Sequence, residues 1–356
     1  MQDLSFYRNR RVLVTGHTGF KGSWLCHMLL DAGAEVTGYA LEPPTEPSLF
    51  ALIGLEKEML SVTGDVRDLA GMQQAFDQAK PEIVIHMAAQ PLVRYGYQHP
   101  VETFATNVMG TVHLLECVRS HDSVRSVVNV TTDKVYQNRE WCWGYREDDR
   151  LDGFDPYSNS KSCSELVTHC YKSSYFASGN PAISTVRAGN VIGGGDFARD
   201  RIIPDCVRAQ QRGEPISVRN PYSIRPYQHV LEPLVAYLMI AQRQMEKPGL
   251  ANWYNIGPDE QDCVTTGTLA DLFCIAWGEG ASWINLSERN APHESGNLKL
   301  DCSLAKSVFG WKPTWHIDQA VEQTCRWSKV WLQQGNLWEE MRRETDAFFA
   351  EMRQRA

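Results

Sequence analysis

Short apolar runs alternate with segments of helical periodicity along the first half of the chain. Five runs rich in β-branched residues occur, at 11–16, 34–40, 82–89, 126–132 and 182–193. Their length and composition are typical of strands buried on both faces. Between them, apolar residues recur at helical spacing, as in 23–33 and 107–121. Strands that alternate with helices require right-handed crossovers, so the pattern predicts an α/β fold with a doubly wound parallel sheet.

This regular alternation ends near residue 190, where glycine-rich and proline-bearing stretches begin. We therefore expect a Rossmann domain over 1–190, completed by a return segment at about 228–257. The remaining ranges, 191–227 and 258–356, are expected to form a smaller irregular α/β lobe. Ligands of doubly wound sheets bind at the carboxyl ends of the strands. The lobe is therefore expected to cover that edge and to bind the substrate.

Composition narrows the choice of partners. The 356 residues are 43% hydrophobic, and the net charge of −8 is spread along the chain. This distribution favours neither a nucleic-acid surface nor a membrane surface, so a small molecule is the expected partner. Ten cysteines occur without a CxxC pair, which argues against a metal site and against a disulfide framework. The first residues lack the apolar core of a signal peptide, and we expect a cytoplasmic protein.

A glycine-rich segment, "TGHTGFKGSWL", follows the first expected strand and opens a helix. Gly16, Gly19 and Gly22 are spaced three residues apart, with Phe20 and Lys21 between the last two. Such glycines allow a tight turn and let the backbone approach a pyrophosphate at the helix N-terminus. The segment predicts a dinucleotide site, and a glycine-rich turn that binds nothing is the alternative.

A tyrosine and a lysine follow in "YSNSK". Tyr157 and Lys161 are four residues apart and share one face if the segment is helical. A tyrosine with its ordinary pKa of about 10 is a poor base at neutral pH. A neighbouring ammonium and a cationic nicotinamide both favour the phenolate, which could then take a proton from a substrate hydroxyl. YxxxK alone is common by chance, but the preceding glycine motif strengthens the hypothesis.

The order of these motifs resembles the extended, nucleotide-sugar branch of the short-chain dehydrogenase/reductase superfamily, over essentially the whole chain. The resemblance implies a cofactor, NAD, and a set of residues along it. These residues are Gly16, Gly19, Phe20, Lys21, Gly22, Asp65, Val66, Ala88, Ala89, Gln90, Asn107, Thr131, Tyr157 and Lys161.

One position departs from that branch. Where the branch usually has an aspartate for the adenosine ribose, this chain has Ala40, with Glu42 two residues later. Either Glu42 reaches the ribose or the cofactor is held weakly, and we expect a loosely held NAD. The acids here would repel the 2′-phosphate of NADP, and Lys21 is the one basic residue that could reverse this preference.

A second departure follows the fourth run. Thr132 lies where the superfamily has the hydroxyl that orients the substrate, and Asp133 and Lys134 come next. Relatives with acid chemistry here are nucleotide-sugar 4,6-dehydratases, which typically have Thr-Asp-Glu. The resemblance implies that Asp133 is the general acid at the departing 6-hydroxyl and that Lys134, when neutral, is the base at C5. The residues leave open whether Asp133, Lys134 or a bound water performs each proton transfer. The alternative is that Lys134 points to solvent and pairs with a loop acid such as Glu140.

Five residues are implied by the same resemblance to bind the nucleotide sugar: Arg94, Asn190, Arg201, Arg225 and His293. Guanidinium groups suit a diphosphate because they offer paired donors and stay charged. Each arginine could equally form a structural ion pair. Lys299 is a weak substitute for an arginine that relatives often carry after the histidine.

Within the dehydratases, Thr-Asp-Lys together with "RPYQHVLEPL" is similar to the CDP-glucose 4,6-dehydratases, whose products feed dideoxysugars of bacterial surface polysaccharides such as O-antigen. CDP-glucose is therefore the expected substrate. The alternatives are a dehydratase of another nucleotide sugar, a nucleotide-sugar 4-epimerase, and a non-catalytic NAD-binding module. Helices at 101–120 and 157–177 correspond to those that relatives pair between subunits, which predicts a homodimer or homotetramer.

Overall fold

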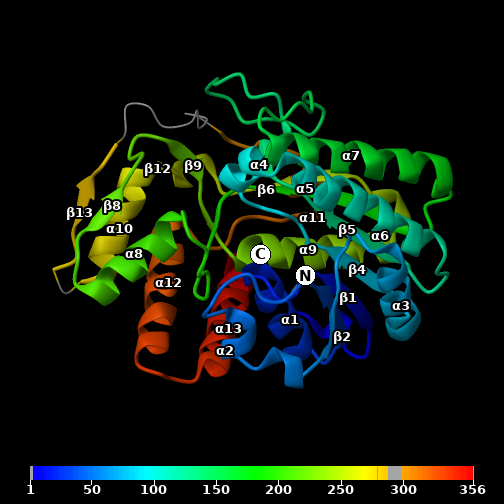
Figure 1. The fold of residues 1–356 in the computed structure, drawn as a ribbon, viewed down its shortest axis with the longest axis horizontal. Coiled ribbons are helices and arrows are strands. Elements are labelled where there is room, and N and C mark those ends of the chain that lie inside the picture. The colour runs from blue at the N-terminus through cyan, green and yellow to red at the C-terminus, as the bar shows by residue number, and fades with distance from the viewer. Residues whose placement is uncertain (1–2, 279, 288–297, 356) are drawn as a thin grey trace.

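A seven-stranded parallel sheet forms the centre of the molecule, in the order β11-β6-β5-β4-β1-β2-β3 (Figure 1). The structure is a computed structural model that describes residues 3–278, 280–287 and 298–355. The strands are β1 (Arg11–Thr15), β2 (Glu35–Ala40), β3 (Leu60–Thr63), β4 (Ile83–His86), β5 (Ser126–Val130), β6 (Ala182–Ala188) and β11 (Trp253–Ile256). The predicted doubly wound sheet is confirmed.

Strand β3 was not among the predicted runs. It has four residues at the edge of the sheet, and all of them are at least partly exposed. An edge strand of this kind lacks the continuous apolar run that marks the central strands. Strand β11, at the opposite edge, lies within the predicted return segment at 228–257.

Helices cover both faces of the sheet because successive strand residues point to opposite faces. Val12 and Val14 of β1 pack with one set of helices, and Leu13 packs with the other. The first set is α1 (Phe20–Asp31), α9 (Leu231–Glu246), α11 (Ser303–Phe309) and α13 (Leu337–Arg355). The second set is α3 (Leu69–Ala79), α6 (Gly110–Arg119) and α7 (Pro156–Tyr175).

A second lobe, on the left in Figure 1, has a core of its own. Its helices and strand pairs are α8 (Ile202–Arg212), α10 (Thr266–Trp277), α12 (Ile317–Leu332), β7 (Val191–Ile192) with β10 (Gln228–His229), β8 (Ile216–Val218) with β13 (Trp283–Asn285), and β9 (Ile224–Pro226) with β12 (Cys263–Thr265). The strands of this lobe are only two or three residues long, which is too short for an alternating pattern to be detected. This explains why the sequence loses its regular period here.

Short helical segments complete the described chain. They are α2 (Leu49–Leu52), α4 (Val93–Gln98), α5 (Pro100–Phe104), a π-helical segment (Ala105–Met109), and 3-10 turns at Ser5–Tyr7, Leu55–Lys57, Asp133–Val135, Pro248–Leu250 and Glu260–Asp262. The helix expected at 107–121 therefore begins with a π-helical turn before it becomes α6.

The last helix, α13, returns to the sheet layer. Phe348 of α13 is buried in the same core as Trp24 of α1, and the Arg342 guanidinium lies 2.6 Å from Asp31 at the end of α1. The core of the sheet layer is thus built from both ends of the chain.

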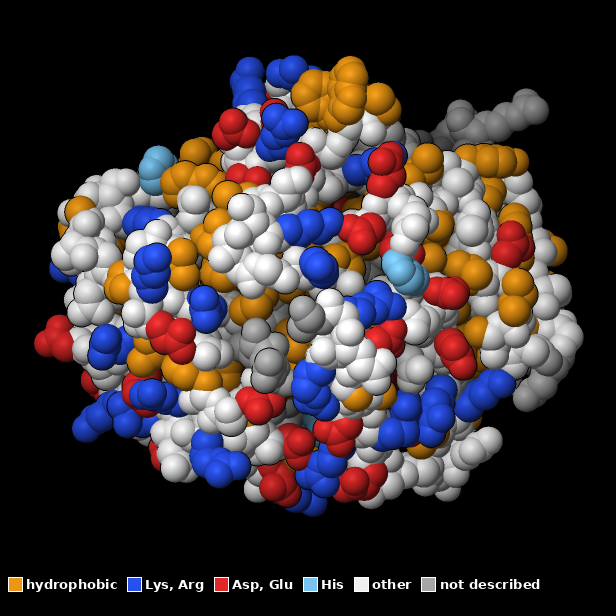
Figure 2. All heavy atoms as spheres, turned by 180° about the vertical axis from the view of Figure 1, so that it is seen from behind, with side chains coloured by type: hydrophobic (Ala, Val, Ile, Leu, Met, Phe, Trp, Pro, Cys, Tyr) orange, Lys and Arg blue, Asp and Glu red, His pale blue; other side chains and the backbone are white. Residues whose placement is uncertain are grey.

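The surface carries both signs of charge. Figure 2 shows lysines and arginines interspersed with aspartates and glutamates over one face, as the spread charge along the chain predicts. None of the helices in the described ranges is long and apolar enough to cross a membrane. Among the same residues, no three histidine, cysteine or acidic side chains come together as metal ligands.

Candidate active site

The glycine loop between β1 and α1 is tightly packed at two of its three glycines. Gly16 has a left-handed φ of +77°, and a Cβ there would lie 2.8 Å from the backbone nitrogen of Ala88. A Cβ on Gly22 would lie 2.1 Å from the carbonyl oxygen of Gly16. Only glycine fits either position, because the turn, the helix and the chain after β4 meet there.

The third glycine faces open space. At Gly19, the N-cap of α1, a Cβ would have no contact closer than 3.5 Å, to Gly16, among the described residues. Within the same residues, no side chain caps α1 and its first turn contains no acid. The N–H groups of this turn remain available to an anion. The loop therefore fits the pyrophosphate of a dinucleotide.

At the adenosine end of this predicted site, β2 stops at Ala40. Glu42 is exposed, and its carboxylate accepts a hydrogen bond of 3.1 Å from Thr63. Asp65 forms an ion pair of 2.5 Å with Arg67, which holds the pKa of the Asp65 carboxyl below its usual value. Val66 is buried beside α6. The acids that repel a 2′-phosphate are therefore present at this end.

Gln90 and Asn107 are joined by two hydrogen bonds. The backbone N–H of Gln90 donates to Oδ1 of Asn107 at 2.8 Å, and Nδ2 of Asn107 donates to the Gln90 carbonyl at 3.1 Å. The same amide donates to Ser160 of α7 at 2.9 Å. Asn107 lies in the π-helical turn, a feature that is frequent at functional sites. Ala88 and Ala89 precede Gln90 in the chain.

Tyr157 and Lys161 lie in the first two turns of α7 and are buried. Asp155 caps the helix because its carboxylate accepts a hydrogen bond from the backbone N–H of Tyr157. Lys161 donates a hydrogen bond of 3.0 Å from Nζ to the Val130 carbonyl. Burial raises the pKa of Tyr157 to about 12, although a hydrogen bond with Thr132 opposes the shift. Positive charge brought close to Tyr157 would lower that pKa toward neutrality.

Burial and the nearby Lys21 lower the pKa of Lys161 to about 7. Lys161 is only 4% exposed, so water does little to stabilise its ammonium. The lysine is thus close to the point at which it gains or loses a proton at neutral pH.

Asp133 is buried at the end of β5, where Thr132 caps a short 3-10 turn. Its Oδ1 accepts from the Thr132 hydroxyl at 3.0 Å and lies 3.5 Å from Nζ of Lys134. Its Oδ2 has no hydrogen-bond partner within the described part of the chain. A Cβ on Gly189 would lie 3.3 Å from this oxygen. A buried acceptor thus points into the space that Gly189 leaves open.

Lys134 lies beside that acid. Its side chain is 31% exposed, and its ammonium is directed at Asp133. The two titratable groups therefore form one unit next to Thr132 and Tyr157, as the sequence interpretation requires. An exclusively solvent-facing Lys134 does not agree with this contact.

The sequence analysis did not detect a buried ion pair that supports the cluster. Arg187 of β6 and Glu165 of α7 are both 3% exposed and lie 3.0 Å apart. Glu165 also accepts a hydrogen bond from the Thr131 hydroxyl, so the Thr131 side chain supports the ion pair. Arg187 donates to the hydroxyl of Tyr136 at 2.7 Å. A charged residue within the apolar run 182–193 was the available signal.

Arg201 and Arg94, two of the predicted substrate residues, both lie near acidic side chains. Arg201 pairs with Asp196 at 2.9 Å, and its charge is close enough to Tyr157 to influence the pKa of that phenol. Arg94 is exposed on α4 and lies 3.9 Å from Asp200, next to Arg201 in the chain.

The other predicted substrate residues differ in their surroundings. Arg225 is buried in β9, next to Pro226, which lies against Gly189. The Asn190 carbonyl accepts a hydrogen bond from the Gln228 backbone. Lys299 pairs with Glu260 at 2.7 Å. His293 lies outside the described residues.

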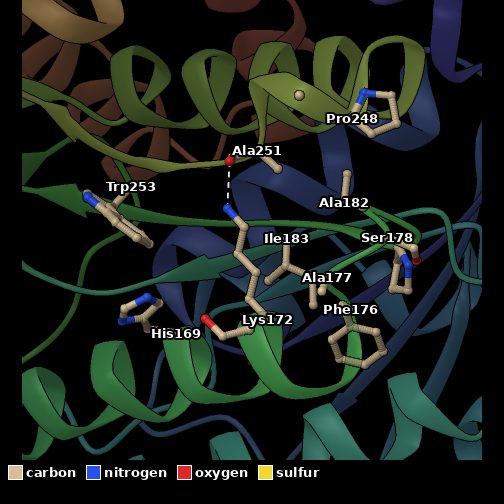
Figure 3. A pocket seen from close by; sticks show the side chains of 14 residues that line it. His169, Lys172, Phe176, Ala177, Ser178, Ala182, Ile183, Pro248, Ala251 and Trp253 are labelled. Carbon is tan, nitrogen blue, oxygen red and sulfur yellow. Dashed lines mark hydrogen bonds between the residues drawn. The ribbon is translucent and has the colours of Figure 1, made fainter.

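A hollow of about 460 Å³ lies away from this cluster, at the other end of α7 (Figure 3). His169, Lys172, Phe176 and Trp253 are among its lining residues. Lys172 donates to the Ala251 carbonyl at 2.6 Å. Its lining, within the described residues, contains no carboxylate.

Comparison with known proteins adds three findings. Residues 13–324 match the family described as GDP-mannose 4,6 dehydratase. A CDP-glucose 4,6-dehydratase of Salmonella typhimurium is 50% identical over 93% of this chain and 94% of its own length. A dTDP-glucose 4,6-dehydratase of Xanthomonas campestris is 24% identical over 90% of this chain and 94% of its own.

Solved structures show the same fold. A UDP-glucose 4-epimerase of Thermotoga maritima with UDP-glucose has a TM-score of 0.78 at 22% identity, covering 90% of this chain and 99% of its own. A dTDP-glucose 4,6-dehydratase of Bacillus anthracis in complex with NAD has a TM-score of 0.75 at 20% identity, covering 92% and 99%. Epimerases and dehydratases thus share this architecture, and the side chains must distinguish them.

Proposed function

The chain belongs to the GDP-mannose 4,6-dehydratase family, and we propose that it acts in the cytoplasm on CDP-D-glucose, giving CDP-4-keto-6-deoxy-D-glucose. It is a hydro-lyase that works with NAD. The choice of CDP-glucose is supported by the 50% identity to the Salmonella typhimurium enzyme over nearly the full length of both chains.

The observation that carries the proposal is the Asp133 and Lys134 unit beside Thr132 and Tyr157. A 4-epimerase needs Thr132, Tyr157 and Lys161, but it has no use for an acid and a base next to them. Dehydration needs both, because a proton leaves C5 while a hydroxyl leaves C6. The same unit argues against a non-catalytic module, in which a buried unpaired carboxylate oxygen would only cost stability.

Tyr157 is the proposed base of the first step. Its phenolate takes the proton of the 4-hydroxyl, which Thr132 orients, and Lys161 stabilises the phenolate from the same face of α7. When bound, NAD supplies the hydride chemistry, from C4 of the sugar and back to C6. The residues proposed to hold NAD are those of the glycine loop together with Asp65, Val66, Ala88, Ala89, Gln90 and Asn107. Thr131 is proposed to contribute through its backbone only, because its hydroxyl donates to Glu165.

Asp133 and Lys134 are proposed to carry out the elimination. The 4-ketone makes the C5 proton acidic, and neutral Lys134 takes it. As the C6–O bond breaks, protonated Asp133 gives its proton to the departing hydroxyl, which leaves as water. Lys134 then returns a proton to C5 when C6 is reduced. Oδ2 of Asp133 faces the space beside Gly189, where this hydroxyl would need to lie.

The nucleotide sugar is proposed to lie between the two parts of the chain that the sequence predicts, 1–190 with 228–257 and 191–227 with 258–356. Arg201 and Arg225 are the proposed diphosphate ligands, Asn190 supports them, and Arg94 approaches from α4. Arg201 supports this placement best because its charge already influences Tyr157.

We also propose that the protein forms a homodimer or homotetramer through the helices near 101–120 and 157–177. Large apolar side chains are exposed there on several turns, namely those of Val101, Met109, Leu166 and Tyr175. Light scattering should give a mass of at least two chains, and a monomeric mass would contradict the proposal.

The function can be tested with CDP-glucose and NAD in deuterated water, with the product followed by NMR and mass spectrometry. We expect a 4-keto-6-deoxy sugar with one solvent deuterium at C5, because Lys134 exchanges its proton with water before returning it. The dTDP-linked, UDP-linked and GDP-linked glucose or mannose substrates test the base preference. Recovery of the starting sugar or its C4 epimer would overturn the dehydratase proposal.

A further inference from the structure

The 3-10 turn that contains Asp133 and Lys134 offers these two side chains few contacts of their own. Among the described residues, the Asp133 carboxylate and the Lys134 ammonium form hydrogen bonds only with the Thr132 hydroxyl and with each other. Both residues belong to a turn of three residues, Asp133–Val135. The positions of the two groups relative to Tyr157 therefore depend on the backbone of this turn and on the contacts that fix it.

Tyr136 ends the turn, and its side chain is 2% exposed. The Arg187 guanidinium donates to the Tyr136 hydroxyl at 2.7 Å, and this hydroxyl donates to Oδ1 of Asn255 at 2.7 Å. The Tyr136 ring stacks on that of Tyr145, with ring centres 5.1 Å apart and planes 13° apart. Since the hydroxyl both accepts and donates a hydrogen bond, it fixes the end of the turn to two strands, β6 and β11.

Arg187 is itself fixed by Glu165 of α7. Nε and a terminal nitrogen of the guanidinium donate to the two carboxylate oxygens at 3.0 Å and 3.1 Å. A two-point pair of this kind sets the plane of the guanidinium as well as its position. Glu165 lies four residues after Lys161 and eight after Tyr157, so the three side chains share one face of the helix. The pair therefore relates the helix that carries the phenol to the turn that carries the acid and the amine.

The other end of the turn is held separately. The Thr131 hydroxyl donates to Glu165, and the Thr131 backbone N–H donates to the Val186 carbonyl at 2.9 Å. Thr132, which orients the 4-hydroxyl in the proposed oxidation, directly follows this fixed point. Loss of the Tyr136 contact would therefore loosen the acid and the amine, while Thr132 stays held from β5.

We propose that Tyr136 is a positioning residue for the elimination step, because its hydroxyl fixes the turn that aligns Asp133 and Lys134 with the sugar. This inference rests on the proposed dehydration of CDP-glucose. Tyr136 acts only through the turn, and the oxidation of C4 by Tyr157 and Thr132 does not depend on it. A displacement of reacting groups by about 1 Å can cost up to about 10²-fold in rate.

Two substrates separate the two steps. CDP-6-deoxy-D-glucose has no hydroxyl at C6, so it can be oxidised at C4 but cannot lose water. Tyr157 takes its 4-hydroxyl proton while the C4 hydride reduces the nicotinamide, and the absorbance of the reduced form gives the rate constant of oxidation. CDP-D-glucose passes through both steps, and its 4-keto-6-deoxy product gives the rate constant of dehydration. Both are measured in single turnovers with NAD-loaded protein in excess. The ratio of dehydration to oxidation then isolates the elimination step.

Tyr136→Phe removes the hydroxyl and keeps the ring. We expect the ratio of dehydration to oxidation to fall about tenfold, because the turn moves relative to the sugar. The oxidation of CDP-6-deoxy-D-glucose should stay within about twofold of the native rate, because its reacting groups do not move. An unchanged ratio would overturn the inference. Equal slowing of both rates would also overturn it, since a merely structural role of Tyr136 does not distinguish the two steps.

Tyr145→Phe is the matched control on the adjacent ring. It also removes the hydroxyl of a buried tyrosine with two hydrogen bonds, one from the Arg139 backbone N–H at 2.7 Å and one to Asn138 at 2.9 Å. Its ratio should stay within about twofold of the native value, because this hydroxyl does not contact Arg187 or Asn255. An equal fall of the ratio in both variants would overturn the inference. Urea unfolding of each variant shows that the rates come from folded protein.

The outcome can be separated from that of the proposed function. If native protein forms no dehydrated product from CDP-D-glucose, the proposed function is overturned and the inference falls with it. If native protein forms the product and Tyr136→Phe keeps the native ratio, only the inference is overturned.

Discussion

The two ends of α7 carry similar lysines in very different surroundings. Lys161 donates to the Val130 carbonyl and Lys172, about three turns later, donates to the Ala251 carbonyl. Burial lowers the pKa of both. Lys161 lies beside Tyr157 and a second cation, whereas Lys172 lies over the Trp253 ring at 5.4 Å, at the hollow in Figure 3.

The comparison shows that a hollow and a perturbed lysine do not make an active site. The hollow beside Lys172 has the space for a ligand, yet its described lining offers no acid to complement the lysine. At the other end, Tyr157, Asp133 and Lys134 bring a phenol, a carboxyl and an amine together in one cluster. Chemistry needs titratable groups with opposite tasks, at the edge where parallel strands end.

Replacement of the two lysines should have very unequal consequences for the rate, and this is the largest expected effect. Lys161→Met removes the cation that stabilises the phenolate of Tyr157, so the kcat for product formation should fall by about 10³-fold. Lys172→Met is the matched control on the same helix and should change kcat less than about twofold. Steady-state rates with CDP-glucose check both. Similar losses in the two variants would mean that the two ends of α7 do not differ as described.

Between the two lysines, Glu165 has a structural task. Glu165→Gln leaves the Arg187 guanidinium buried without its counter-charge, so the free energy of unfolding should fall by about 3 kcal/mol. Urea unfolding measures the change. Glu116→Gln on α6 breaks an exposed pair with Arg119 and should cost less than about 1 kcal/mol. If the two substitutions cost the same, the buried pair does not stabilise the middle of α7.

Asp133→Asn separates oxidation from elimination at the catalytic end. The amide cannot protonate the departing hydroxyl, so product formation should slow by about 10²-fold. Oxidation of C4 does not need this acid, so reduced nicotinamide should accumulate and be visible by its absorbance. Asp77→Asn, at an exposed acid on α3, is the control and should behave as native protein. Equal slowing of both steps would assign Asp133 a role in binding.

The pH dependence of stability should report the burial of Lys161 at the start of α7. Burial lowers the pKa of Lys161 from 10.5 to about 7, so between these values the unfolded chain binds more protons than the folded one. The free energy of unfolding should therefore rise with pH above 7, by roughly 1 kcal/mol per pH unit from this group. Urea unfolding of nucleotide-free protein at several pH values should give a shallower slope for Lys161→Met. Parallel slopes would show that Lys161 stays charged in the folded protein.

The sequence was sufficient to predict the sheet because its central strands are apolar on both faces. β3 was missed because an edge strand of four partly exposed residues has no such run. The glycine loop was predictable from spacing alone, since Gly16 and Gly22 fit only without a side chain. The tyrosine and lysine pair was predictable for a similar reason, because positions four apart share a helical face.

Other properties of the candidate site depend on contacts between distant segments. The Lys21 ammonium lies 6.0 Å from the ring of Tyr237, which is more than 200 residues later in the chain. Glu165 and Arg187 meet only because α7 packs across β6. The π-helical turn that holds Asn107 has the same apolar spacing as ordinary helix nearby. The local pattern of the sequence does not reveal such contacts between distant residues.

The return of α13 to α1 has a consequence for synthesis on the ribosome. When the strands of the sheet have all emerged, the core that contains Trp24 of α1 still lacks Phe348. The nascent chain must carry an exposed apolar surface until α13 is released. Fusion or truncation near α13 would therefore disturb the packing of α1, which is synthesised more than 300 residues earlier.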